Sequence, residues 1–161
     1  MTTTTGNREP VHVNVRYGDR WGSHATYRIY GSYFRRRHSV DASGDSIQDS
    51  WEAGVGGFRA DWSPSPVTSF TFQGDLLSRR ADETLLLPML TPPFQKISTS
   101  RQEHRSGNLL FRWNHRLSEG NDWTLQAYYD RVNRGTQALG EELDTFDFDF
   151  HHHFKAGSWH E

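Results

Sequence analysis

Residues Ala53–Ser78 read AGVGGFRADWSPSPVTSFTFQGDLLS, and this stretch predicts a β-hairpin. In its second half, apolar and polar side chains alternate with the period of two that places neighbouring residues on opposite faces of a strand. Phe70 and Phe72 belong to one parity, whereas Thr71 and Gln73 belong to the other. Between the halves, a Ser-Pro-Ser-Pro sequence ends one strand and begins the next, because proline fixes φ and donates no backbone hydrogen bond.

The two parities of this hairpin differ in chemistry. One is rich in aromatic side chains, and the other carries charges and amides. A barrel wall with lipid outside and water inside has this pattern. Within the first half, the apolar parity switches at Gly56 and Gly57, and such a switch predicts a β-bulge at this pair.

The same alternation recurs along the chain and predicts seven strands. They are expected at about residues 11–17, 25–33, 51–62, 68–78, 108–117, 123–130 and 146–154. Three long connections, His38–Asp49, Arg79–Arg105 and Asn133–Glu142, alternate with short ones. In an up-and-down transmembrane barrel, tight turns lie at one end and long loops at the other. The sequence therefore predicts an all-β fold, an antiparallel up-and-down meander of about seven long strands that forms an incomplete segment of a transmembrane β-barrel.

Composition narrows the class of protein. The chain has 161 residues, enough for one domain. Leu, Ile, Val and Phe make up about a fifth of it, which is close to the level at which a chain cannot bury enough apolar surface to fold in water. Six Trp and six Tyr are side chains that favour a membrane interface. The net charge of -2 gives no reason to expect a nucleic-acid partner.

Several classes of site find no support in the sequence. Cysteine is absent, which excludes disulfides, zinc–thiolate sites and thiol catalysis. The first ten residues, MTTTTGNREP, have neither the basic nor the apolar region of a secretory signal. No apolar run approaches the roughly 18 residues of a transmembrane helix. No arrangement of nucleophile, base and orienting acid is apparent, so we expect neither enzymatic activity nor a cofactor.

A series of short motifs follows in order along the chain. It consists of YRIY at Tyr27–Tyr30, GFRADWSP at Gly57–Pro64, FQGD at Phe72–Asp75, QAYYD at Gln126–Asp130 and DTFDFDF at Asp144–Phe150. This ordered series resembles the barrel of TonB-dependent outer-membrane receptors. The likeness covers nearly all of residues 11–155.

The resemblance implies a function and a location. Members of that family place an N-terminal plug domain inside a barrel of about 22 strands. They import scarce ligands such as iron siderophores, cobalamin or oligosaccharides, with energy delivered by TonB. The implied location is the outer membrane of a Gram-negative bacterium. The implied partners are outer-membrane lipid, the remainder of the barrel and plug, TonB through that plug, and a small-molecule ligand.

The chain is accordingly divided into three parts. We expect a disordered tail at residues 1–10, a partial TonB-dependent receptor β-barrel at 11–155 and a turn or cut end at 156–161. Two other functions fit the same pattern. One is a small outer-membrane β-barrel that forms a pore. The other is a soluble lipocalin-like binding protein, in which the aromatic side chains would point inward.

The candidate ligand-binding residues are polar side chains that parity places on the water-facing side of the wall. Their role would be to hydrogen-bond a hydrophilic ligand in transit, and the Arg79–Arg105 connection is expected to assist them. The set comprises Arg28, Tyr30, Gln73, Asp75, Arg112, Asn114, Gln126, Tyr128, Asp130, Asp147 and Asp149.

One further cluster has the chemistry of a metal site. On a strand, His151 and His153 share a face with Asp147 and Asp149, and imidazole with carboxylate suits a transition metal. A polar, water-facing wall explains the same residues without a metal. The sequence therefore does not require a metal at this position.

Overall fold

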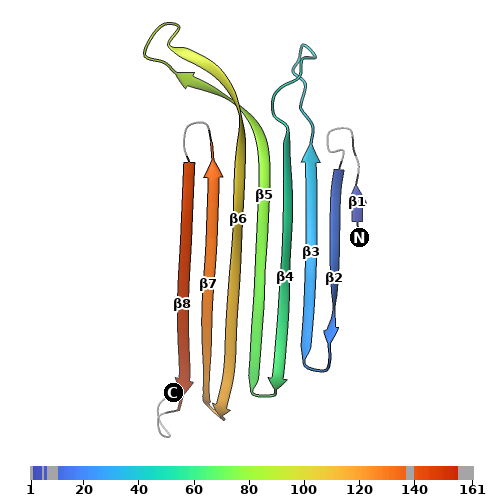
Figure 1. Ribbon diagram of the computed structural model, residues 1–161, viewed down its shortest axis with the longest axis vertical. Coiled ribbons are helices and arrows are strands. Elements are labelled where there is room, and N and C mark those ends of the chain that lie inside the picture. Colours follow the sequence, from blue (N-terminus) through green and yellow to red (C-terminus); the bar gives the residue numbers. More distant parts are fainter. Residues whose placement is uncertain (1, 5, 7–10, 137–139, 156–161) are drawn as a thin grey trace.

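The computed structural model describes residues 2–4, 6, 11–136 and 140–155. Eight strands form one antiparallel up-and-down sheet, and each strand pairs with its neighbours in sequence (Figure 1). The strands are β1 (Thr2–Thr4), β2 (Val11–Trp21), β3 (Ala25–Arg36), β4 (Trp51–Ser65), β5 (Thr68–Pro88), β6 (Gln95–Ser118), β7 (Asn121–Gly135) and β8 (Gly140–Phe154). The all-β meander expected from the sequence is thereby confirmed.

The count of strands differs from the expected seven by one. The seven expected strands correspond to β2–β8, and β1 is additional. Thr2–Thr4 pairs with β2 at His12, Val13 and Asn14, so this part of the expected disordered tail belongs to the sheet. The expected C-terminal turn at 156–161 lies outside the described residues.

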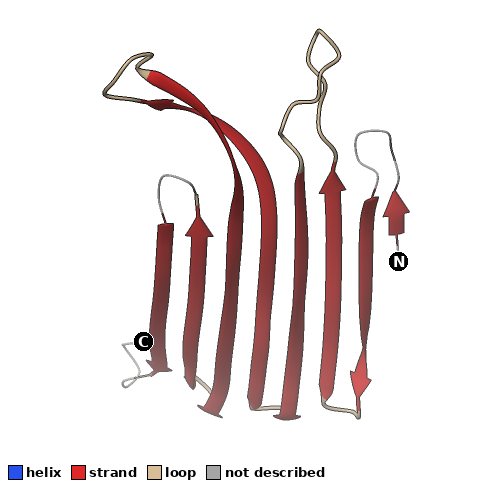
Figure 2. Ribbon diagram, turned by 45° about the horizontal axis from the view of Figure 1, so that its top comes forward, coloured by secondary structure: helices blue, strands red, loops and turns tan. Residues whose placement is uncertain are grey.

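The connections sort to the two ends of the sheet, as the alternation of their lengths predicted (Figure 2). We name these the turn end and the loop end. At the turn end, Gly22 and Gly120 adopt φ of 69° and 70°, a conformation that favours glycine. Two turns there are hydrogen-bonded to a neighbouring strand: the Ser63 N–H of β4 donates to the His24 carbonyl at 2.7 Å, and the Arg116 N–H of β6 donates to the Val67 carbonyl at 2.8 Å.

The expected long loop at Arg79–Arg105 is mostly strand, and that prediction is wrong. β5 and β6 stay paired up to Pro88 and Gln95, so only residues 89–94 connect them. The prolines gather at this tip, where they leave the ladder intact. This part of the hairpin extends past the neighbouring strands at the loop end (Figure 1), so neither face has a consistently apolar row and no period-two signal appears in the sequence.

The expected β-bulge at Gly56 and Gly57 is also wrong. β4 pairs with both neighbours without interruption from Trp51 to Trp62, and its register shift lies between Trp62 and Ser65. Gly56 pairs with Gly31 and with Leu76. The apolar parity changes because the loop end of the opposite face has apolar side chains of its own, and the backbone stays regular.

The sheet is a single layer, and it is not closed. No hydrophobic side chain among the described residues is buried. In the part of the chain that the structure describes, β1 and β8 do not pair, so both edges of the sheet are open. Within the same residues, no helix has the length and apolar character to cross a membrane. Both faces of the sheet are therefore uncovered in the part of the chain that the structure describes.

Candidate functional site

The register divides the side chains into two faces, because residues paired across antiparallel strands point to the same side. We name a set of cross-strand partners a row. The aromatic face contains the row Tyr27, Ala60, Phe72, Phe111, Ala127 and Phe148, and the row Ala25, Trp62, Phe70, Trp113, Leu125 and Phe150. The opposite face, which carries Arg59, Gln73 and Tyr128, is the polar face.

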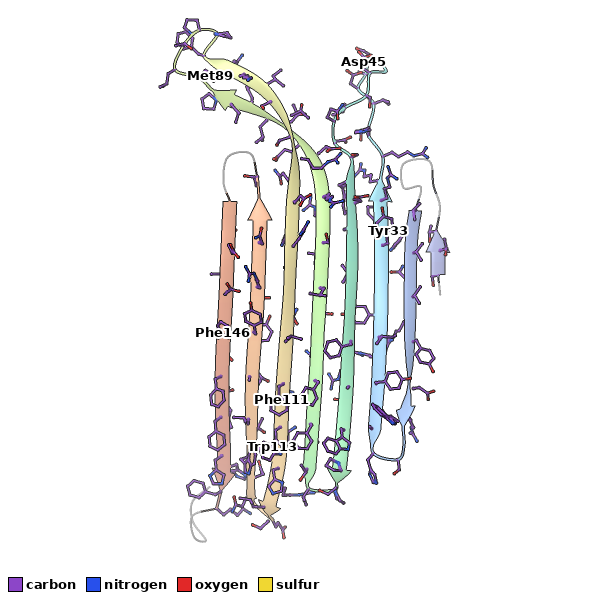
Figure 3. All side chains as sticks on the ribbon, viewed as in Figure 1. Tyr33, Asp45, Met89, Phe111, Trp113 and Phe146 are labelled. Carbon is purple, nitrogen blue, oxygen red and sulfur yellow. The ribbon has the colours of Figure 1, made fainter. Side chains whose placement is uncertain are left out.

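Aromatic rings of the aromatic face gather toward the turn end, where Phe111 and Trp113 lie in Figure 3. Trp62 stacks on Phe70 with ring centroids 5.1 Å apart, and Trp113 meets Trp123 edge-on at 4.2 Å. Toward the loop end, the face ends in a charged row that contains Arg35, Glu52, Arg80 and Glu103. Apolar rows thus form a band between an aromatic border and a charged border.

This band does not follow the rows of cross-strand partners but is inclined to them. On β3 it runs from Tyr33 to Ala25, and on β8 it runs from Phe146 to Phe154, which is eight residue steps or about 27 Å in each case. The row of Tyr33 reaches β8 at Glu142, four residues before Phe146. That shift is about 14 Å over five strand spacings totalling about 24 Å, which corresponds to an inclination of about 30°.

The band is hollowed at its loop-end half. A shallow apolar depression of about 1570 Å³ lies there, and it is lined in part by Gly31, Gly54, Gly56, Gly74 and Gly107. Glycine removes the side chains that would fill this surface. The aromatic face can therefore contact hydrocarbon chains, or it can cover an apolar ligand.

All eleven candidate ligand-binding residues lie on the polar face. Register partners unite Tyr30, Asp75 and Asp130 in one row, Arg28, Gln73, Tyr128 and Asp147 in the next, and Arg112, Gln126 and Asp149 in the third, followed by Asn114 in the fourth. The structure thus brings these side chains together on one surface.

In the described part of the chain, cross-strand hydrogen bonds involve four of these side chains, Gln73, Arg112, Asn114 and Gln126. Arg112 donates from Nε and Nη2 to the Gln126 Oε1 at 3.0 and 2.6 Å. Asn114 donates to Ser69 at 3.1 Å and accepts from Thr124 at 2.8 Å. The middle and turn-end part of the polar face therefore presents donors and acceptors that a hydrophilic molecule could contact.

Two further residues of this face, Arg59 and Asp61, are not among the candidates expected from the sequence. The Arg59 Nε lies 2.7 Å from the Asp61 Oδ2, and Thr71 donates to Asp61 at 2.7 Å. The signal was present, since both residues alternate with Phe58 and Trp62. Because a bulge was expected at Gly56 and Gly57, the sequence did not decide which face of the sheet Arg59 and Asp61 occupy.

Asp75 and Arg112 belong to different rows. Asp75 pairs with Gly57 and Asn108, whereas Arg112 pairs with Thr71 and Gln126. A Cβ built at Gly57 would overlap the Asp75 Oδ1 and would lie 2.6 Å from the Tyr30 Oη. Both side chains therefore extend over Gly57, which leaves them room because it has no side chain.

The three adjacent histidines make separate contacts. The His151 Nε2 lies 3.1 Å from the Asp149 Oδ2, and the His153 Nδ1 lies 3.3 Å from the Asp122 Oδ2. His152 points to the aromatic face and contacts Asn121. Among the described residues, no group of three or more potential ligands is gathered for a metal ion.

Two carboxylates hold the β3–β4 loop at the loop end. The Ser50 Oγ donates to Asp82 at 2.5 Å, and this hydrogen bond, aided by Arg101, lowers the pKa of Asp82 from its ordinary value. Hydrogen bonds from Ser39 likewise lower the pKa of Asp49. Both groups are anchors for the loop, whose tip carries Asp45 (Figure 3).

Comparisons with protein families, with curated proteins and with solved structures find no match for this chain. The assignment of a function therefore depends on the chemistry of the two faces.

Proposed function

We propose that this chain forms part of the barrel wall of a TonB-dependent receptor in an outer membrane. The aromatic face would contact lipid, and the polar face would line the lumen through which a scarce ligand such as an iron siderophore, cobalamin or an oligosaccharide passes. The partners would be lipid, the remaining strands and plug, and TonB through that plug.

The inclined apolar band is the observation that carries this proposal. Its height of about 27 Å along the strands projects to roughly 23 Å at an inclination of about 30°, close to the apolar band of about 25 Å in transmembrane barrels. Strands of such barrels tilt by roughly 35–45°, so a band parallel to the membrane must cross the register obliquely. Closed soluble barrels tilt their strands as well, so the height of the band supports the membrane wall more than its inclination does.

The open edges of the sheet support the role of a wall segment. Among the described residues, β8 pairs with β7 alone, and β1 pairs with β2 at His12–Asn14. Unpaired backbone N–H and C=O groups are costly in lipid. Neighbouring strands on both sides would satisfy these edge groups in a membrane.

Partition between detergent and water tests the proposal against the lipocalin-like alternative. The full chain would be refolded from urea with and without a nonionic detergent that separates into two phases on warming. We expect β-sheet circular dichroism and recovery in the detergent-rich phase, with precipitation when detergent is omitted. A monomer that stays folded in the aqueous phase would mean that the aromatic face is a protein interior.

A further inference from the structure

Four polar side chains line a small hollow on the polar face near the loop end. The hollow has a volume of about 210 Å³, and its polar lining includes Arg79, Gln102, His104 and Arg134. Register partners place Arg79, His104 and Arg134 in one row across β5, β6 and β7. Since a water occupies about 30 Å³ in the liquid, the hollow has room for several water-sized groups.

The donors of this hollow are largely unused by the protein. The His104 Nε2 is inaccessible to solvent and has no hydrogen-bond partner. Among the described residues, neither Arg79 nor Arg134 forms an ion pair within 4.0 Å. Arg79 lies over the Trp51 ring, with its Cζ 5.5 Å from the ring centroid, so an aromatic contact restricts its position while its donors stay free.

The acidic residues nearby do not neutralise this row. Glu103 also lines the hollow, but its carboxylate belongs to the aromatic face, where it accepts from Arg80 at 3.1 Å and from Arg105 at 3.3 Å. Glu141 is the register partner of Arg134 on β8, and no ion pair within 4.0 Å joins the two. Two guanidinium groups thus flank an unpaired imidazole without a carboxylate partner.

We infer that Arg79, His104 and Arg134 form a binding site for a tetrahedral oxyanion, such as the phosphate group of a ligand. Each guanidinium presents a fork of donors that pairs with two oxygens, and the His104 imidazole lines the hollow between them. Arginines two strands apart, about 10 Å between Cα atoms, can approach one anion from opposite sides. So many donors match three or four oxygens better than the two of a carboxylate.

This inference deepens the proposed function, because it names the chemical group that the loop end of the lumen would hold. It depends on the proposed function only for the ligand's route. The site itself needs only the paired strands β5, β6 and β7.

Titration with inorganic phosphate tests the site. The full chain, folded in nonionic detergent micelles at physiological salt, would be titrated by calorimetry, with acetate as the comparison anion. We expect saturable binding of phosphate and none of acetate. The variants Arg79→Gln and Arg134→Gln should each weaken binding by about tenfold or more, since each removes charge-assisted hydrogen bonds.

Arg80→Gln is the matched control, because Arg80 is the neighbour of Arg79 in sequence but lies on the aromatic face. It should leave phosphate binding unchanged. Equal weakening by all three variants, equal binding of acetate, or no saturable binding would overturn the site. Circular dichroism of each variant and detergent partition of the same sample separate this result from failure of the fold or of the proposed function.

Discussion

Gly57 leaves room for two neighbouring side chains of the polar face. Tyr30 and Asp75 extend over it from the strands on either side, and a Cβ at this position would lie 2.6 Å from the Tyr30 ring. An aromatic side chain that covers a cross-strand glycine stabilises a sheet and fixes its register. At Gly54, three residues earlier on the same strand, a Cβ would meet nothing within 4 Å.

Replacing Gly57 by Ala should therefore destabilise the sheet, while the control Gly54→Ala should not. We expect a loss of about 1–3 kcal/mol for Gly57→Ala, because the methyl group displaces Tyr30 and Asp75. Urea unfolding in detergent micelles, followed by tryptophan fluorescence, measures both variants. Equal stability of the two would refute the proposed packing over Gly57.

Individual residues also mark the limit of what the sequence could predict. Parity alone placed all eleven candidate residues on one face, because a strand alternates strictly when one side is apolar. It missed Arg59 and Asp61, since Trp51 and Val55 point to the polar face and resemble a change of register. The row Arg79, His104 and Arg134 could not be found either, because it depends on pairing across β5–β6–β7 in a segment expected to be a loop.

β6 shows the division of chemistry within one element. Its neighbouring residues Leu109 and Leu110 have the same side chain, yet Leu109 pairs with Gly74 and Tyr129 on the aromatic face. Leu110 pairs with Gln73 and lies on the polar face. Because the native side chain is leucine at both positions, a difference in the effect of the same substitution reports the environment of each face.

A charge at these two positions should have unequal costs. Leu109→Lys is expected to destabilise the folded chain in lipid vesicles by about 1–3 kcal/mol, because it lies inside the lipid-facing band between its middle and its charged border. Leu110→Lys should cost less than about 1 kcal/mol, since its ammonium group would remain in water. Reversible urea unfolding in vesicles gives both values, and a larger loss for Leu110→Lys would contradict the assignment of faces.

Elements were predicted well where they carry an alternating apolar face and poorly elsewhere. β2–β8 were recognised in order, because their central residues alternate. The outer parts of β5 and β6, from Arg79 to Arg105, were missed because their side chains lack that alternation. β1 is only three threonines long and has no pattern that distinguishes it from a tail.

The described part of the molecule is one sheet whose two faces differ in chemistry. One layer of strands separates an aromatic face from a polar face, and no described hydrophobic side chain is buried. If the proposed function holds, lipid would cover the aromatic face, and the inclined apolar band has about the height that this requires. The edge strands β1 and β8 each have one partner strand among the described residues.

Single-cysteine scanning of β6 tests the central claim most directly, because the chain has no cysteine of its own. Each residue from Asn108 to Trp113 would be replaced in turn by Cys, and labelling by a water-soluble maleimide would be timed in lipid vesicles. We expect positions 108, 110 and 112 to react at least about tenfold faster than 109, 111 and 113, with the period of two of a strand between water and lipid. Uniform reaction at all six positions, or faster reaction at 109, 111 and 113, would contradict a lipid-facing aromatic face.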